Sequence, residues 1–482
     1  MPLALVVSLL PLALGPAEWG SFRGPNGAGR GAPGSVPAAL ALEDGVAWRV
    51  EVPSGYSSPV VAGARVFVTG ADGDELLTLC LDADSGAILW RRAIPSGGEA
   101  PGQGHVAAPT PATDGARVVA LFHGAGPVAY DLDGEELWRA DPGVALRIPH
   151  GIATSPVIAR GRVLLQLDHD AGSRLACFDA TTGEEVWSAP RPRAMHGYAT
   201  PAVWTPDGPD ARAEVVVVGS YEVHGYSLDD GELLWRVTGG AWQTKGVPVI
   251  DGARCVVNAS AQVYADTGLP RLPPTWDAFL ALRDADGDGL VSREEWPDEG
   301  VQRIWTVFDL EGDDRLDAQD FAYVKTIETE RGAVLSIRLG GRGDVTGTHV
   351  DWRYGDRRGL SDVVSPVLAG GRVLLLRAGG IVTALDGASG TSVAQGRLGR
   401  ADPYFASPVT DGERVLATSV HGRLCAVSAS APVDELWSVD LDERTWGTPA
   451  LARGRVFVRT MDALWCLRPT GGGVGGDAAS DD

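Results

Sequence analysis

Residues 284–295 combine acidic residue types with a spacing that could bind a metal ion. Oxygen-bearing side chains stand at the first, third, fifth, ninth and twelfth positions, as Asp284, Asp286, Asp288, Ser292 and Glu295. Gly289 at the sixth position allows a sharp turn, and Leu290 at the seventh would contribute its backbone carbonyl. The pattern predicts a calcium site. An acidic surface turn is the plainer alternative, but it does not account for so many matched positions.

A second, poorer copy of this loop begins 25 residues later and covers residues 309–320. Its expected ligand positions are Asp309, Glu311, Asp313, Arg315 (through its carbonyl), Asp317 and Asp320. Asp314 replaces the glycine of the sixth position, and Asp320 is one methylene shorter than glutamate, so its bidentate reach is reduced. A weak calcium site and a degenerate loop that only braces the first remain equally open.

Helical patterns flank both loops, as expected for a pair of EF-hands. WDAFLALR precedes the first loop, and Leu316 is positioned to pair with Val291 in the short strand that couples two such loops. A calcium sensor needs a helix pair that opens. In an exported protein, where calcium is plentiful, we expect a structural clip instead.

The surrounding chain is a repeat of short strands. Eight segments begin with a Pro-Val-like strand, for example SSPVVAGARVFV at 57–68 and SPVLAGGRVLLL at 365–376, and most contain a Gly turn before a Val-rich strand. In four units a Trp follows a turn Gly by four residues, as in Gly86 and Trp90. Units of about 48 residues predict one four-stranded blade each. The fold class is therefore all-β, an eight-bladed β-propeller.

The two ends of the repeat complete each other. The last unit, 448–469, lacks a Trp strand, while residues 46–52 form a Trp strand with no unit before them. Pairing these two segments would close the ring and remove an exposed edge. Trp235 and Trp352 stand 117 residues apart, so the helical, acidic stretch interrupts blade five.

These patterns divide the chain into five parts. The expected boundaries are a signal peptide at 1–17, an N-terminal extension at 18–43, the propeller at 44–469, the EF-hand insertion at 268–331 and a disordered acidic tail at 470–482.

Composition and charge restrict the partners and the cellular compartment that we expect for this protein. The net charge is −22, from 41 basic and 63 acidic residues, which disfavours nucleic acid. The apolar run at 3–14 suits a signal peptide and is too short to span a membrane. We therefore expect a soluble, extracytoplasmic (periplasmic or secreted) monomer without a membrane span. Five scattered cysteines do not indicate a disulfide framework.

The repeat unit, SPV…GRV…(L/F)D…TG…W, resembles the pyrrolo-quinoline quinone (PQQ) repeat of PQQ-binding-like propellers. Trp19-Gly-Ser-Phe-Arg23-Gly-Pro-Asn-Gly-Ala-Gly29 is similar to the opening segment of a bacterial exported group within them, in which EF-hand insertions are familiar. The resemblance extends through GGRGDVTGTHVDWRY at 340–354. It implies either a quinoprotein dehydrogenase or a scaffold like the outer-membrane assembly lipoprotein BamB.

The scaffold alternative is favoured. The alcohol-oxidising branch typically carries adjacent cysteines, which this chain lacks, and no residue matches the catalytic aspartate. The resemblance places calcium on the quinone in those enzymes, whereas the loop described above is a separate site. We expect a non-catalytic, calcium-binding scaffold with an unidentified protein or small-molecule ligand at the propeller face. A PQQ-dependent dehydrogenase is the less favoured alternative.

Residues just before the first strands should line the channel mouth. Candidate ligand residues there are Tyr56, His105, His150, His196, Tyr198, Trp242, Lys245 and Trp446, with Asp344 in the GRGDVT segment as a further candidate. Converging aromatic and cationic groups suit a polar aromatic ligand. The alternative for these residues is that they pack and cap loops, and for Asp344 that it caps a bulged turn. A metal site built from the three histidines is disfavoured.

Overall fold

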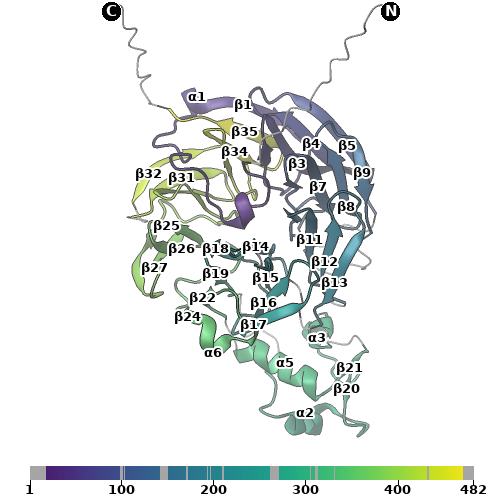
Figure 1. Cartoon of the computed structure of the whole chain (residues 1–482). Helices are drawn as coiled ribbons and strands as arrows, with labels where there is room; N and C mark the ends of the chain where they lie inside the picture. Colours follow the sequence, from purple (N-terminus) through teal and green to yellow (C-terminus); the bar gives the residue numbers. More distant parts are fainter. Residues whose placement is uncertain are drawn as a thin grey trace, which may run out of the picture.

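Eight small sheets surround a common axis in the computed structural model (Figure 1). The predicted eight-bladed propeller, closed by the N-terminal strand and interrupted by helices in blade five, is confirmed. The structure describes residues 18–97, 101, 104–141, 150–169, 172–192, 194–195, 197–208, 211–260, 271–303, 305–309, 313–329, 332–430 and 434–470. The expected signal peptide and nearly all of the expected acidic tail lie outside these ranges.

Blades one to four follow the sequence in order. Their strands are β2 (Val60–Ala62), β3 (Arg65–Asp72), β4 (Glu75–Asp82) and β5 (Ile88–Pro95); β6 (Ala112–Thr113), β7 (Arg117–Phe122), β8 (Gly126–Asp131) and β9 (Glu136–Arg139); β10 (Val157–Ala159), β11 (Arg162–Leu167), β12 (Arg174–Asp179) and β13 (Glu185–Pro190); β14 (Ala202–Trp204), β15 (Glu214–Val218), β16 (Glu222–Ser227) and β17 (Leu233–Thr238).

Blades five to eight complete the ring. Their strands are β18 (Val249–Asp251), β19 (Arg254–Asn258), β22 (Val334–Arg338) and β24 (Val350–Tyr354); β25 (Val367–Ala369), β26 (Arg372–Arg377), β27 (Ile381–Asp386) and β28 (Ser392–Arg397); β29 (Val409–Thr410), β30 (Arg414–Thr418), β31 (Arg423–Ser428) and β32 (Glu435–Asp440); β33 (Ala450–Ala452), β34 (Arg455–Arg459), β35 (Ala463–Leu467) and β1 (Val46–Glu51).

The ring closes where β1 pairs with β35. The strands run antiparallel, with Trp48 opposite Cys466 and Glu51 opposite Ala463. Because the first and last parts of the propeller share one sheet, neither end leaves a free blade edge at this seam. The five cysteines are all buried and unpaired.

Most repeated tryptophans join one blade to the next. The Trp90 indole donates a 2.9 Å hydrogen bond to the carbonyl of Leu132 in the following blade. Gly134 of that blade has a φ of +87°, and a Cβ added there would lie 2.8 Å from the Trp90 ring. The repeat position therefore requires glycine for two reasons: the turn is left-handed, and the indole approaches too closely for a Cβ.

Blade four departs from this pattern. Trp235 donates instead to Glu214 of its own blade, at 2.7 Å. The residues that follow β22 form β23 (Gly343–Asp344), which pairs in parallel with β17 as a fifth strand, and then the short helix α6 (Thr346–His349). The 340–349 segment of blade five thus covers the outer edge of blade four.

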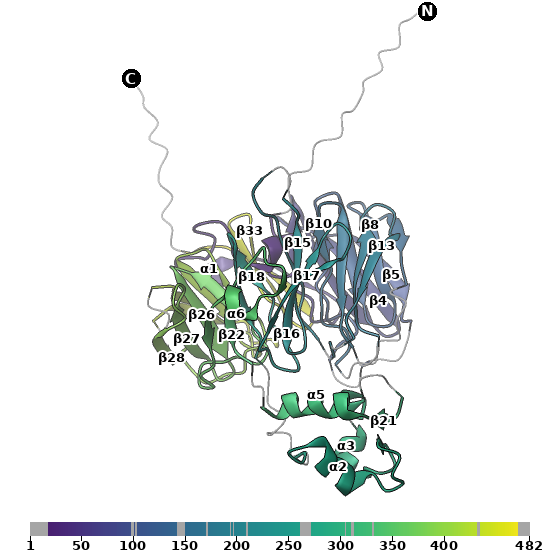
Figure 2. The ribbon, with the colours of Figure 1, turned by 60° about the horizontal axis from the view of Figure 1, so that its bottom comes forward.

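The helical insertion lies between β19 and β22. It contains α2 (Trp276–Arg283), β20 (Val291–Ser292), α3 (Glu299–Arg303), α4 (Trp305–Phe308), β21 (Arg315–Leu316) and α5 (Ala318–Thr329). Figure 2 shows these helices beyond one face of the propeller. That face is also where the first strands begin, because β19 runs antiparallel to β18 and ends there.

A belt of hydroxyl groups joins the first strands, which are the strands that contact one another around the axis. In seven of eight blades a Ser or Thr precedes the repeat proline; these are Ser58, Thr110, Ser155, Thr200, Ser365, Ser407 and Thr448. Each hydroxyl oxygen accepts the backbone N–H of the equivalent residue in a neighbouring blade, at 2.8–3.1 Å. Val247 takes this place in blade five and leaves one gap. We call these seven side chains the hydroxyl belt.

The N-terminal segment, residues 18–40, crosses the channel toward the far ends of the first strands. Trp19 bridges to Val61 of blade one, and Thr410 of blade seven bonds through its backbone to Gly29 and Gly31. The short 3-10 helix η1 (Pro25–Gly27) contacts β14 and β18, and lies inside the ring in Figure 1. A short helix, α1 (Leu42–Gly45), then leads into β1.

Candidate functional site

The first acidic loop has carboxylates close enough to share one cation. It starts where α2 ends, and Thr275 caps the start of that helix by accepting from the Ala278 N–H at 3.3 Å. Oxygens of Asp284, Asp286 and Glu295 all lie within 4.8 Å of one another. Hard oxygen ligands of this kind suit Ca²⁺.

Backbone N–H groups orient these carboxylates. Glu295 accepts from the N–H of Ser292 and of Ala285, both at 2.7 Å, and these bonds lower the pKa of Glu295 to about 2. Gly289 has a φ of +85°, as the sixth position of the loop requires, and its N–H donates to Asp284 at 3.0 Å. The Glu295 carboxyl is therefore ionised at neutral pH.

The other expected ligands of this loop lie beside the cluster. The Ser292 hydroxyl donates to Glu295 at 2.9 Å, and the Leu290 N–H donates to Asp288 at 2.8 Å. Asp288 also forms a 2.8 Å ion pair with Arg315 of the second loop. A cation bound here would therefore compete with Arg315 for Asp288.

The second loop has a different character. Asp309 and Asp320 are almost fully buried, and Asp309 accepts from the N–H groups of Asp313 (3.2 Å) and Asp314 (2.8 Å). Asp314 takes the left-handed turn, with a φ of +62°. Asp317 caps α5 by accepting from Gln319 and Asp320, and Glu311 lies outside the described residues.

The two loops are joined as the sequence predicts. β20 pairs antiparallel with β21, with Val291 opposite Leu316 and Ser292 opposite Arg315. The apolar core below includes Phe279 of α2, whose ring contacts both Phe321 of α5 and Trp296.

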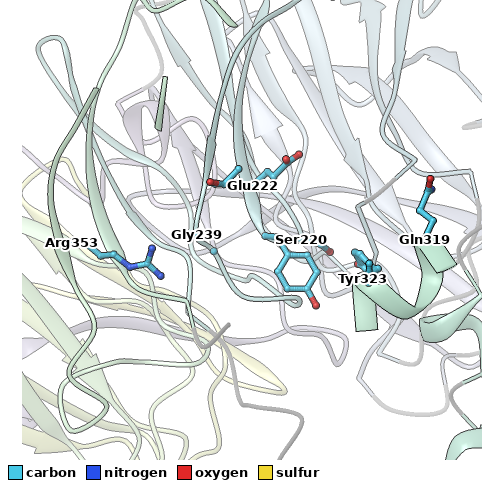
Figure 3. Close-up of a pocket in the computed structure, with 10 residues that line it drawn as sticks. Ser220, Glu222, Gly239, Gln319, Tyr323 and Arg353 are labelled. Carbon is cyan, nitrogen blue, oxygen red and sulfur yellow. The ribbon is translucent and has the colours of Figure 1, made fainter. Parts of the chain in front are cut away.

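The insertion also packs on the propeller. Tyr323 of α5 meets Tyr221 of blade four edge to face, with ring centroids 5.0 Å apart. Met195 and Trp242 from neighbouring propeller loops join the same apolar cluster. Between α5, blade four and Arg353 of β24 lies a groove of about 430 Å³, which also includes Glu222 and Gln319 (Figure 3).

Three of the predicted channel-mouth residues meet in one cluster. Tyr56 stacks on Trp446 with centroids 4.7 Å apart and planes 14° apart, and the His105 ring lies 5.1 Å from Tyr56. The guanidinium of Arg444 lies over Trp446 at 4.6 Å. Burial and the charge of Arg459 lower the pKa of His105 to about 4, so its ring is neutral at pH 7.

The remaining candidates make other contacts. His150 meets Tyr198 edge to face at 5.8 Å, and Lys245 donates to Gln243 at 3.0 Å. Burial lowers the pKa of Lys245. Trp242 packs against the insertion core, and His196 lies outside the described residues.

The placement of Asp344 at the channel mouth is wrong. Asp344 is exposed on β23 at the outer edge of blade four, where it pairs with Arg236 at 3.3 Å and accepts from the Thr346 N–H. It caps a turn, which is the alternative that the sequence left open, although the setting is an added strand rather than a bulge.

A buried polar chain in blades three and four was not foreseen from the sequence. Arg191 and Asp168 form a buried bidentate pair at 2.7 and 3.0 Å. Arg191 also donates to His224 Nδ1 at 3.1 Å, which fixes the His224 proton on Nε2, 2.9 Å from Glu222. Glu222 lines the groove beside α5. Asp168 and Arg191 belong to blade three and Glu222 and His224 to blade four, so no single local motif marks this chain.

No helix among the described residues is long and apolar enough to cross a membrane.

The fold and its repeat define a large single-ring propeller with a small helical insertion. A family model described as outer membrane protein assembly factor BamB matches residues 32–198, 171–274 and 324–472, which together exceed half of the chain. The chain belongs to this family of PQQ-like propellers. No curated protein sequence matches it.

Solved structures share the fold at low sequence identity. BamB from Moraxella catarrhalis aligns with a TM-score of 0.54 and 11% identity, covering 89% of this chain and 100% of that chain. Quinohemoprotein alcohol dehydrogenase from Comamonas testosteroni aligns with a TM-score of 0.58 and 12% identity, covering 96% and 83%. A europium-containing methanol dehydrogenase aligns with a TM-score of 0.53 and 11% identity, covering 93% and 98%. These likenesses show the fold alone.

The mouth cluster does not fit a quinone held between two aromatic rings. Each aromatic contact needs about 3.5 Å, so an inserted planar cofactor would hold the flanking rings about 7 Å apart. Tyr56 and Trp446 stack directly, with centroids 4.7 Å apart. A planar ligand could enter between Tyr56 and Trp446 only if the two rings moved apart.

Proposed function

We propose that this protein is an exported, non-catalytic binding or scaffolding propeller whose helical insertion binds calcium as an EF-hand. The observation that carries the proposal is the first loop, in which three carboxylates lie within 4.8 Å of one another and glycine occupies the strained sixth position. The membership in the BamB-like family and the apolar run at residues 3–14 support a place outside the cytoplasm.

Calcium in this loop would act as a clip. Loop one is joined to loop two by the β20–β21 pair, and α5 follows directly from loop two and packs on blade four. Ordering the first loop would therefore stiffen the support of the propeller face. The groove beside α5 and the mouth cluster on the same face are the surfaces we propose for a protein or small-molecule ligand.

Calorimetric titration of the mature protein with calcium, and then with PQQ in saturating calcium, tests the proposal. We expect calcium binding that Glu295→Gln weakens by at least about 100-fold, because it removes the bidentate ligand. Glu294→Gln removes the same charge from the neighbouring exposed, non-ligating position and should leave binding nearly unchanged. No calcium heat in the wild type would refute the EF-hand site.

The PQQ arm separates the two functional classes. No heat with PQQ supports the non-catalytic proposal. Stoichiometric PQQ binding would replace it with a PQQ-dependent dehydrogenase, for which dye-linked oxidation of alcohols and sugars is the next assay.

A further inference from the structure

Arg23 is a fully buried cation near the propeller axis. It belongs to the N-terminal segment, and its Nη2 donates to the carbonyls of Pro366 (2.7 Å) and Pro408 (3.3 Å), which begin the first strands of blades six and seven. Gly29, with a φ of +68°, packs against the guanidinium so closely that an added Cβ would lie 2.6 Å from it. The guanidinium is therefore held in place by the segment and by two blades.

This guanidinium has more donors than acceptors around it. Its Nε and Nη1 have no hydrogen-bond partner within the part of the chain that the structure describes. Its two acceptors are neutral carbonyls. Burial lowers the pKa of Arg23 to about 9, so the group stays charged at pH 7. A buried charge without a counter-charge costs several kcal/mol.

The hydroxyl belt supplies further potential donors in the same strands. Pro366 and Pro408, whose carbonyls accept from Arg23, directly follow Ser365 and Ser407 of the belt. Each belt oxygen already accepts one backbone N–H, and no acceptor for a belt O–H is found among the described residues. All seven side chains are buried.

We propose that a small monovalent anion, such as chloride, binds within the propeller beside Arg23 and the hydroxyl belt. An anion accepts hydrogen bonds without donating any, which matches a site that presents N–H and O–H groups and one positive charge. A buried water would satisfy some of these donors but would leave the charge of Arg23 uncompensated. The N-terminal segment thus supplies the charged part of an internal anion site.

Anion-dependent unfolding tests the site. We expect the Tm of the wild-type protein to be on the order of 2 °C higher in sodium chloride than in sodium gluconate at equal ionic strength, because gluconate is too large for a packed interior. Arg23→Gln should abolish that difference. Arg30→Gln, in the same segment but exposed, should keep it. Equal responses of the wild type and Arg23→Gln would overturn the proposal.

A second test uses crystals of the wild-type protein soaked in bromide, so it does not require a folded variant. We expect an anomalous peak within hydrogen-bond distance of the Arg23 guanidinium. Bromide found only on the outer surface, or nowhere, would show that water or protein groups satisfy these donors.

Discussion

At the scale of single residues, the surroundings of His105 on the propeller face lower the pKa of its ring. Its Nδ1 accepts the Ala107 N–H at 3.1 Å, and its ring packs beside Tyr56. Burial and nearby Arg459 favour the neutral ring and bring its pKa to about 4, against 6.5 for a free histidine. The unfolded chain therefore binds more protons at this position between those two pH values.

The free energy of unfolding should fall as pH is lowered from 6.5 to 4, because protonation favours the unfolded state over that range. For a partly buried ring, we expect His105 to contribute on the order of 1–2 kcal/mol of this loss. Urea unfolding across this pH range measures it, and His105→Asn should flatten the curve. His349→Asn, on α6 at the outer edge, is the control. A slope unaffected by His105→Asn would contradict the assignment.

Residue types and spacing predict the acidic loop and the aromatic cluster at the channel mouth, but not the two buried arginines. The acidic loop was visible because each of its ligand positions has its own residue preference. Tyr56, His105 and Trp446 are predictable because they stand just before the first strands, at the expected channel mouth. Arg23 and Arg459 were missed because their burial depends on contacts more than 340 residues away in the sequence.

At the scale of elements, the insertion is a separate unit that the chain enters and leaves through blade five alone, between β19 and β22. In blade one the equivalent connection, between β3 and β4, needs only two residues. The insertion has its own apolar core, built from α2 to α5, and touches the propeller through Met195, Tyr221 and Trp242. The ring itself does not need these helices to complete blade five.

Replacing residues 259–332 with a short Gly-containing turn should therefore leave a folded propeller. We expect native-like β-sheet circular dichroism and a cooperative transition, with Tm lower by roughly 5 °C because the apolar contact area on blade four becomes exposed. The deletion exposes apolar residues on the propeller. Adding Met195→Ser and Tyr221→Ser to it should therefore make the protein more soluble, with the same β-sheet circular dichroism. Loss of the cooperative transition would show that the insertion is part of the ring's own core.

Local sequence patterns predict where each strand lies, but they do not predict which strand it pairs with. Short alternating strands and Gly turns predicted every blade. Asp344 is a channel-mouth candidate by sequence, yet its strand pairs with the outer strand of blade four. Parallel pairing between blades leaves no periodic mark in a two-residue strand.

At the scale of the whole molecule, the ring is stabilised where its ends meet. Arg459 of β34 reaches into blade one, where it donates to Ser57 Oγ at 3.0 Å and to the carbonyls of Thr69 and Pro53. The side chain is almost fully buried. It joins the last blade to the first beyond the β1–β35 pairing.

Arg459→Met should lower the free energy of unfolding by on the order of 3 kcal/mol, because it removes the buried donors that Arg459 supplies to the carbonyls of Pro53 and Thr69 and to the Ser57 hydroxyl. Arg49→Ala breaks an exposed 2.8 Å ion pair with Glu443 near the same seam and should change the free energy by less than about 1 kcal/mol. Urea unfolding of both variants makes the comparison. Similar effects of the two substitutions would show that Arg459 does not secure the closure.

The closure of the ring also sets an order of events during synthesis. β1 precedes the other strands of all eight blades along the chain, whereas its partner β35 follows them and ends at Leu467. The strand must therefore wait, with its hydrogen-bonding edge unsatisfied, until all the intervening blades have been made. Contacts so distant along the chain form slowly. We expect the completed ring to appear in one late step, and chains that stop early to be the ones that need a chaperone.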